Sequence, residues 1–425
     1  MTTRRGLTFA AALAAATLAP PAAAQGAAGA PAASAEKPVD KPAQVKADAE
    51  GFSLQSGDGA WRLRLGGYAQ FDGRFFPDDE ARAATDTFVL RRVRPIVQGT
   101  VGKHFDFYVN PDFGGGATVL QDAYLDVRTT PKFRVRVGKF KVPFGLERLQ
   151  SGAALLFVER ALPTAIAPNR DLGVQLHGEL LGGALQYQAG VFNGVVDGGS
   201  ADADTNDGKD LAARLFVQPF KRGKTKALAK LGFGLAATRG EQSGALPSYR
   251  SGGQLAFFGY ATGVTADGQR SRLSPQLQWS HARLGLFAEY ARSTQDVRRG
   301  TDVVSLTNDA WQAALAVTLT GEEAAPGGVR PRRAFDPANG QWGALELAVR
   351  WNALTIDDDA FRRGLADPAR SAREARAWAL GLNWYLSRNV KQTVSFERTR
   401  FRGGAAAGAD RPSENALFIR SQVAF

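Results

Sequence analysis

The chain of 425 residues carries 53 Lys and Arg against 41 Asp and Glu, which gives a formal net charge of +12 at pH 7. It contains no cysteine and three histidines, which excludes disulfide scaffolds, thiol nucleophiles and cysteine-based zinc sites. Its basic residues alternate with apolar ones instead of forming runs, so we expect no nucleic-acid partner. We also expect no metal site, no cofactor and no enzymatic activity.

The first 24 residues have the form of a secretory signal peptide. Arg4 and Arg5 precede a short apolar stretch, and Ala22 to Ala24 supply a small-residue cleavage site. Residues 25–50 consist mainly of Ala, Pro and Lys, so they cannot bury enough apolar surface to fold and are predicted to be a disordered linker. No later segment is apolar for the length that a transmembrane helix needs.

From Trp61 onward, apolar and polar residues alternate in one segment after another. In residues 61–75 the odd positions are apolar or small, and the even positions are mostly polar or charged. Successive side chains of a strand point to opposite faces, so each such strand has one apolar and one charged face. The pattern returns in residues 133–137, 172–180, 211–217, 311–319, 391–399 and 417–425. A soluble β-sandwich would give the same alternation.

The connections between these segments alternate in length, which favours an outer-membrane barrel over a sandwich. Short turns are expected at residues 102, 182–183, 281–282 and 387–389, and long loops at 194–208, 294–307, 357–374 and 402–414. Bacterial barrels have an even number of strands, so we assign the extra candidate, residues 255–261, to a loop. The prediction is an all-β fold: a transmembrane antiparallel β-barrel of about 16 strands over residues 51–425, wide enough for an aqueous channel.

If the apolar faces contact lipid, the barrel interior receives charged side chains from most strands. Arginine is permanently charged and offers a fork of donors that suits phosphate or carboxylate, and rings of such residues select anions. Acidic residues also face the interior, so some arginines are expected to brace the wall as ion pairs. The predicted interior arginines are Arg62, Arg64, Arg74, Arg92, Arg94, Arg134, Arg136, Arg214 and Arg350.

Residues 139–168 break the strand rhythm. Lys139 and Lys141 lead into a segment whose residues 153–158 are apolar, which is unusual for a loop exposed to water. We predict an inward-folded constriction loop that packs its apolar side on the wall and turns Arg148 and Ser151 toward the interior. An ordinary surface loop with a short helix is the alternative.

Several stretches together resemble the phosphate-selective porins of the O and P type. They are residues 65–75, 91–95, 112–116, 138–145 and 383–386, and the resemblance covers about residues 51–425. It implies a homotrimer of 16-stranded barrels, with inward loops at a constriction and a column of arginines that leads phosphate to it.

The resemblance also implies particular site residues. An arginine pair and an acid of the constriction correspond to Arg91, Arg92 and Asp126, whereas Lys141, Arg148 and Ser151 are approximate counterparts of its lysine and serines. Strict alternation turns Arg91 outward if Arg92 faces inward, so the pair requires a strand end or a β-bulge.

The sequence therefore predicts a porin in the outer membrane of a Gram-negative cell, a passive channel for anions, with phosphate or polyphosphate favoured. A general or sugar-permeable porin is the alternative. The expected partners are small anions, outer-membrane lipid, lipopolysaccharide and two further copies of the chain. The expected pore-lining residues are Arg62, Arg64, Arg74, Arg91, Arg92, Arg94, Asp126, Arg134, Arg136, Lys139, Lys141, Arg148 and Ser151.

Overall fold

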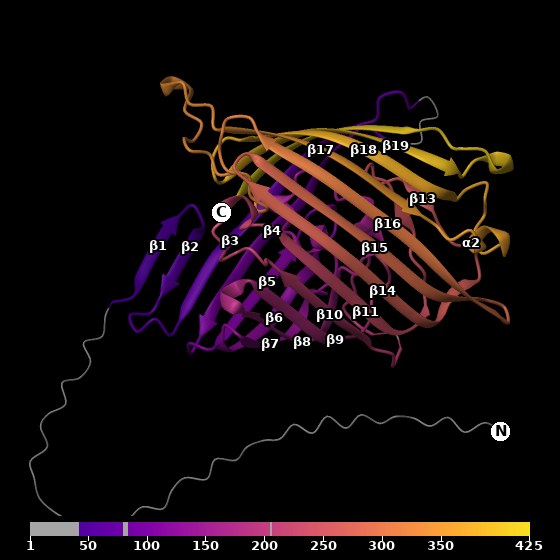
Figure 1. Cartoon of the computed structure of the whole chain (residues 1–425), viewed down its shortest axis with the longest axis horizontal. Coiled ribbons are helices and arrows are strands. Elements are labelled where there is room, and N and C mark those ends of the chain that lie inside the picture. Colours follow the sequence, from indigo (N-terminus) through magenta and orange to yellow (C-terminus); the bar gives the residue numbers. More distant parts are fainter. Residues whose placement is uncertain (1–41, 80–83, 205) are drawn as a thin grey trace, which may run out of the picture. The chain divides into compact units, whose positions relative to one another are not determined.

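A closed antiparallel sheet dominates the computed structural model, which describes residues 42–79, 84–204 and 206–425 (Figure 1). The predicted signal peptide and most of the predicted linker lie outside these residues. The main sheet has 18 strands, and all but β1 and β2 form the barrel, which confirms the expected 16. The barrel strands are β3 (Arg62–Phe75), β4 (Thr87–Val101), β5 (Phe105–Asp112), β6 (Val119–Thr130), β7 (Phe133–Lys141), β8 (Arg170–Leu180), β9 (Leu185–Phe192), β10 (Asp210–Val217), β11 (Gly232–Gly244), β14 (Val264–His281), β15 (Leu284–Arg299), β16 (Asp302–Thr318), β17 (Ala344–Thr355), β18 (Ala372–Tyr385), β19 (Val390–Gly403) and β20 (Glu414–Ala424).

The barrel closes where β20 pairs with β3, residues 417–424 lying opposite residues 68–75. At the seam the terminal Phe425 donates its N–H to the Gly67 carbonyl at 2.9 Å, and its own carbonyl accepts from the Gly67 N–H at 2.7 Å. Before this point β3 pairs instead with β2 (Gly51–Gln55), so β3 changes partner around Gly67. Closure leaves the barrel without a free sheet edge, as a strand structure in a bilayer requires.

A small hairpin precedes the barrel. Strand β1 (Gln44–Asp48) pairs with β2 and lies inside the segment 25–50 that the sequence predicts to be disordered. All five residues of β1 are exposed, so the strand is held by backbone hydrogen bonds and carries no hydrophobic pattern that reveals it.

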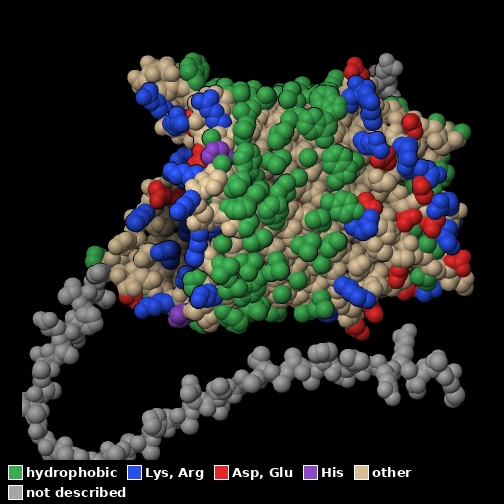
Figure 2. All heavy atoms as spheres, viewed as in Figure 1, with side chains coloured by type: hydrophobic (Ala, Val, Ile, Leu, Met, Phe, Trp, Pro, Cys, Tyr) green, Lys and Arg blue, Asp and Glu red, His purple; other side chains and the backbone are tan. Residues whose placement is uncertain are grey.

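The alternation along the strands sorts side chains between two surfaces. Large apolar residues such as Leu63, Phe71 and Leu380 remain exposed on the outer face, whereas Asp72 and Arg420 are buried inside. Figure 2 shows a broad band of hydrophobic side chains across the outer surface, with charged side chains gathered along its two sides. This band matches the apolar belt of a membrane barrel.

The two ends of the barrel differ. We call the end where β3 begins and β20 ends the terminal rim, and the opposite end the distal rim. Residues 294–307 were predicted to be a long distal loop, but β15 and β16 pair throughout this region and meet in a tight turn at Gly300. Polar outward residues made these strand ends look like a loop. The connections 218–231 and 319–343 on the terminal rim are longer than the predicted short turns.

The distal loops carry little regular structure. Residues 255–261 do not form a strand of the barrel wall, as predicted, since β12 (Tyr249–Arg250) and β13 (Ala256–Phe258) form a separate two-stranded sheet. Phe257 and Phe258 are buried in a cluster with Ile166 and Leu354. The helical segments are α1 (Leu146–Leu149), α2 (Asp359–Arg362), η1 (Gly152–Ala154), η2 (Leu162–Ala165), η3 (Leu181–Gly183), η4 (Lys226–Leu228), η5 (Pro337–Asn339) and η6 (Ala406–Gly408). Within the described ranges, no helix is long and apolar enough to cross a membrane.

The seam at Gly67 yields a stability prediction. Gly67 has φ +153°, and an added Cβ would lie 2.5 Å from the Arg94 carbonyl oxygen. We expect Gly67→Ala to destabilise the barrel by roughly 1–3 kcal/mol because it strains the strand that closes the sheet. The folded band in an unboiled denaturing gel should then disappear at a lower temperature.

Gly285→Ala is the matched control, because an added Cβ in β15 makes only ordinary contacts at 3.8 Å. Equal heat resistance of the two variants would contradict this account of the seam.

Candidate functional site

Residues 142–169, which we call the inner loop, lie against the interior face of the barrel. Their backbone carbonyls accept hydrogen bonds from inward-facing side chains of strands that are distant in the sequence. Such contacts hold a loop without using its own side chains, which then remain free to face the interior. The bonds run from Gln70 to Gly152 O at 2.9 Å, from Lys391 to Leu155 O at 2.9 Å, from Asn383 to Leu156 O at 2.9 Å and from Arg350 to Glu159 O at 3.0 Å.

Two buried glutamates fix the start of the inner loop. The Glu289 carboxylate on β15 accepts the backbone N–H groups of Leu146 and Glu147, the donors that helix α1 leaves unpaired. The Glu147 carboxylate accepts the Ala161 N–H at 2.8 Å and lies 3.5 Å from the Arg350 guanidinium. Both acids are therefore engaged in holding the loop.

A β-bulge supplies the arginine pair. Gln70 lies opposite Arg92 and Phe71 opposite Leu90, so Arg91 is one extra residue in β4. The bulge lets two successive side chains reach the same acid. Arg91 Nε lies 2.6 Å from Glu159 Oε1, and Arg92 Nη2 lies 4.0 Å from Glu159 Oε2.

Glu159 is the acid of this group. Arg74 also reaches it, with Nη2 2.9 Å from Oε1. Burial alone would raise the pKa of the Glu159 carboxyl, but Arg91, Arg92 and Arg74 hold it well below its usual range. The resemblance associated Asp126 with Arg91 and Arg92, but in the described part of the chain no hydrogen bond or ion pair joins Asp126 to either arginine. Asp126 is instead held by Arg134, Arg136 and His177.

Two cavities meet at the inner loop. The distal cavity, of about 650 Å³, opens toward the distal loops, and the proximal cavity, of about 440 Å³, lies nearer the terminal rim. Arg94 and Arg170 line both. The distal cavity is lined by Arg91, Arg92, Arg94, Arg148, Arg160, Arg170 and Arg250 against Asp112, Glu159 and Asp197. The proximal cavity is lined by Arg94, Arg136, Lys141, Arg170 and Arg214 against Asp122.

Some of these cations are neutralised and others are not. Arg94 pairs with Asp112 at 2.7 Å, and Arg170 pairs with Asp122 at 3.3 Å. In contrast, Lys141, Arg148 and Arg160 form no ion pair with a carboxylate in the part of the chain that the structure describes. We call these three residues the loop cation cluster.

The loop cation cluster is organised around backbone oxygens. Lys141 Nζ donates to the Gln150 carbonyl at 2.7 Å, and Arg160 Nη2 donates to the same oxygen at 2.8 Å. Arg148 donates to the Thr164 carbonyl, and its Nε is buried without a partner. A carbonyl offers only a partial negative charge, so positive charge accumulates at this point.

The electrostatics of the cluster reflect this crowding. Burial, together with the neighbouring Arg160 and Arg170, lowers the pKa of Arg148 to about 9. Burial lowers the pKa of Arg160 to about 10, with Arg170 acting in the same direction against Glu147. A bound anion would restore both values, since an opposite charge favours the charged form.

The other predicted residues take different positions. Arg91, Arg92, Arg94, Arg136, Lys141, Arg148 and Ser151 line the two cavities. Arg62 and Arg64 line neither cavity. They lie at the start of β3, where the strand extends beyond β20 and pairs with β2, and they donate hydrogen bonds to Gln55 and Glu50. Lys139 also lines neither and pairs with Asp202. Arg74, Arg134 and Asp126 are engaged in ion pairs on the wall.

Sequence reasoning missed Arg160, Arg170 and Arg250. Arg160 and Arg170 follow the apolar part of the inner loop, outside any alternating segment that assigns them a face. Arg250 lies in β12, where its guanidinium donates to the Gln254 carbonyl at 2.8 Å. Only its positive charge could have identified Arg250 as a site residue.

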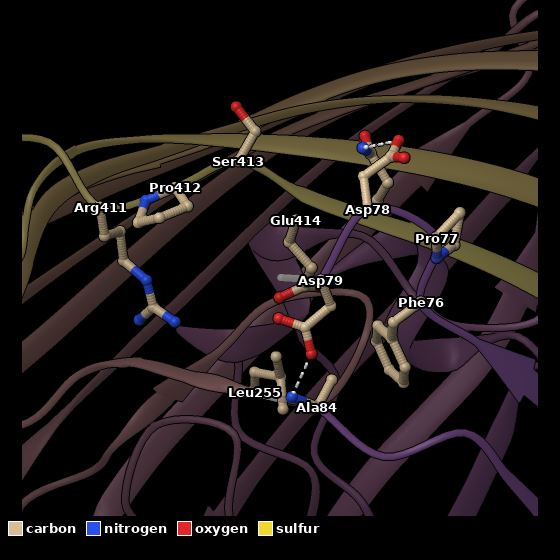
Figure 3. A pocket seen from close by; sticks show the side chains of 11 residues that line it. Phe76, Pro77, Asp78, Asp79, Ala84, Leu255, Arg411, Pro412, Ser413 and Glu414 are labelled. Carbon is tan, nitrogen blue, oxygen red and sulfur yellow. Dashed lines mark hydrogen bonds between the residues drawn. The ribbon is translucent and has the colours of Figure 1, made fainter. Parts of the chain in front are cut away.

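A third cavity, of about 430 Å³, lies between loops at the distal rim (Figure 3). It shares no lining residue with the other two. Asp78, Asp79 and Glu414 outnumber Arg411 in its lining, so its charge is opposite to that of the arginine-lined cavities.

A closed sheet with an apolar outer belt, a charged interior and internal cavities defines a membrane-spanning β-barrel of the porin class. The family model of phosphate-selective porin O and P matches residues 63–425, and the chain belongs to that family. The protein is located in the outer membrane of a Gram-negative bacterium. Its terminal rim is periplasmic and its distal rim extracellular.

Relatives and solved structures agree with this assignment. The chain is 23% identical over 393 residues to Porin O of Pseudomonas aeruginosa, covering 82% of this chain and 85% of that protein. Its fold is similar to the outer-membrane channel DcaP of Acinetobacter baumannii, with a TM-score of 0.59 at 11% identity, covering 87% and 99% of the two chains. It is also similar to the trimer form of OmpT of Vibrio cholerae, with a TM-score of 0.51 at 12% identity, covering 86% and 100%.

Glu159 gives the second prediction. Glu159→Gln removes the charge that Arg91, Arg92 and Arg74 share, and breaking a buried ion pair costs about 3–5 kcal/mol. We expect the free energy of unfolding to fall by that order, measured by urea unfolding in phospholipid vesicles.

Glu323→Gln is the control, since Glu323 forms an exposed ion pair with Lys230 and such pairs contribute little. A Glu159→Gln barrel as stable as this control would rule out Glu159 as the anchor of the arginines.

Proposed function

We propose that the protein is a passive outer-membrane channel for anions and that phosphate or polyphosphate is the preferred substrate. The observation that carries the proposal is the loop cation cluster, in which Lys141 faces the proximal cavity, Arg148 and Arg160 face the distal cavity, and none of the three forms an ion pair with a carboxylate among the described residues. Three such groups offer several charge-assisted hydrogen bonds to one oxyanion. No enzymatic activity is proposed.

The proposed route runs from the distal cavity to the proximal cavity past Arg94 and Arg170, which line both. The inner loop narrows this route and forms its constriction. An anion exchanges its hydration water for guanidinium and ammonium donors there. Binding has to remain weak and distributed over several sites so that the ion can leave. The arginines already paired with Asp112 and Asp122 shape the passage, while the loop cation cluster supplies the net charge.

The wider assembly is part of the same proposal. Residues 1–24 would direct export and be removed, and residues 25–41 would link the mature N-terminus to the hairpin. Three copies would assemble in the membrane, as the fold similarity to a trimeric OmpT supports. The outer surface would contact membrane lipid and lipopolysaccharide.

A sugar-permeable porin is the second candidate, and one observation favours it. Tyr108 and Tyr124, which line the proximal cavity, stack with ring centroids 5.3 Å apart and could form a platform for a sugar ring. The Arg136 guanidinium, however, lies 4.1 Å from the centroid of the Tyr124 ring and covers one of its faces. A covered ring is a poorer stacking surface for a sugar, so a channel for anions is the preferred function.

The test is phosphate block of chloride current through single channels in planar bilayers. We expect phosphate to reduce the current of the natural protein at low concentration. Arg148→Gln combined with Arg160→Gln should weaken this block roughly 10-fold or more, because each lost charge-assisted hydrogen bond contributes about 1.5–3 kcal/mol.

Arg62→Gln combined with Arg64→Gln removes the same charge at the start of β3, beside the periplasmic hairpin, and should leave the block unchanged. Equal weakening in both double variants would reduce the effect to overall charge. Indifference of the natural channel to phosphate, combined with passage of sugars, would favour the second candidate.

A further inference from the structure

The outer wall carries a group of arginines at the extracellular ends of β18 and β19, the strands at the top of Figure 1. The register pairs Arg398 with Trp378, Arg400 with Arg376, and Arg402 with Glu374. We call Arg376, Arg398, Arg400 and Arg402 the outer arginine cluster. It lies outside the barrel and takes no part in the proposed ion route.

Burial shows that the cluster faces outward. The residues between these arginines, including Ala377, Thr399 and Phe401, are buried toward the interior, whereas Arg376 and Arg400 are exposed. Farther along the same outer face come Trp378, Leu380 and Val394, all exposed. The cluster therefore continues the lipid-facing rows of β18 and β19.

The cluster carries unbalanced positive charge. Glu374 is the acid that contacts it, with Oε1 2.7 Å from Arg376 Nε and Oε2 3.9 Å from Arg402 Nε. Arg398 and Arg400 have neither a hydrogen bond nor an ion pair within the described ranges, and Arg398 Nε is buried without a partner. Arg376 and Arg400 lie directly opposite each other, an arrangement that destabilises a sheet unless an anion screens it.

The position of the cluster relative to the membrane interface indicates which lipid groups can reach it. Trp378 and Phe396 form an aromatic pair, with ring centroids 5.5 Å apart, at the extracellular edge of the apolar belt. Arg398 lies directly opposite Trp378, and the opposed Arg376 and Arg400 lie two residues farther out, which is roughly 7 Å along a strand. Aromatic girdles mark the membrane interface, so the arginines lie at the level of the lipid headgroups.

We propose that the outer arginine cluster is a binding site for the phosphate groups of a phosphorylated glycolipid in the outer leaflet. Arg398 and Arg400 would donate forked hydrogen bonds to the phosphate, and the acyl chains would lie along Trp378 and Leu380. The phosphate supplies a counter-charge for Arg398 and Arg400, which have no acid partner among the described residues, whereas Arg376 already has Glu374. This inference rests on the outer-membrane location of the protein and is independent of the proposed anion transport.

A second copy of the chain fits the cluster less well. Two of the acids that face outward at the same rim are already used, since Asp309 pairs with Arg292 at 2.7 Å and Asp267 pairs with Arg298. A neighbouring copy would have to offer free carboxylates, and these two are engaged. A lipid phosphate brings its own charge.

The test uses the full, assembled protein in detergent and measures lipid binding by native mass spectrometry. The probes are lipid A with two phosphates and the same lipid fully dephosphorylated. We expect the phosphorylated lipid to bind roughly 10-fold or more tightly than the dephosphorylated one. Arg398→Gln combined with Arg400→Gln should abolish most of this difference. Arg400→Gln alone, at an exposed side chain without contacts, is the variant least able to disturb folding and should remove part of it.

Arg292→Gln combined with Arg298→Gln is the matched control. It removes the same charge from the same rim, starting two residues beyond Tyr290, but each arginine there has its own acid. Its preference for phosphorylated lipid should stay within about twofold of the natural protein. Equal losses in both double variants would overturn the proposal.

Two further results would also contradict the proposal. If inorganic phosphate displaces the lipid at equal concentration, the cluster is a site for free phosphate. If the Arg398/Arg400 variant dissociates into single copies with lipid binding unchanged, the cluster is a contact between copies. Phosphate block of the current is measured on the same variant and should remain that of the natural protein, so this test and the test of transport can fail separately.

Discussion

The lipid that surrounds the barrel is the constraint from which the rest of the structure follows. Strands that span it must satisfy every backbone hydrogen bond within the sheet, so the sheet closes between β3 and β20 at Gly67 and Phe425. The outer face must be apolar, and strict alternation then turns the charged residues inward. Charge density inside the barrel is thus a consequence of the way the chain spans the membrane.

Inside this wall, acids and bases have different tasks. Glu147, Glu159 and Glu289 are occupied in tying the inner loop to the wall, by ion pairs and by backbone N–H groups. Lys141, Arg148 and Arg160 are left with backbone carbonyls and the space of the cavities. The same loop therefore uses its negative charges for stability and presents its positive charges to the passing ion. A net positive passage arises although acids are abundant in the interior.

The sequence predicts well what depends on period two and poorly what depends on distant contacts. Alternation places Arg92 inside, and the arginine pair that the resemblance implies requires a strand end or a bulge at Arg91. The β3–β4 register contains the bulge. The acid that joins them, Glu159, is 68 residues from Arg91, and no local pattern encodes that contact. Arg62 follows the alternation and still lies outside the cavities, because the start of β3 extends beyond β20 and pairs with β2. Arg160 belongs to a loop without apolar–polar alternation, so only its charge indicated a role in the site.

The central claim is that the ammonium and guanidinium donors of the loop cation cluster bind an oxyanion. Anomalous diffraction from crystals of the natural protein soaked in arsenate, a heavy analogue of phosphate, tests it most directly. The account predicts an arsenic peak within hydrogen-bonding distance of Lys141 Nζ and the guanidinium groups of Arg148 and Arg160. An empty cluster, with arsenic bound only elsewhere or nowhere in the barrel, would contradict it.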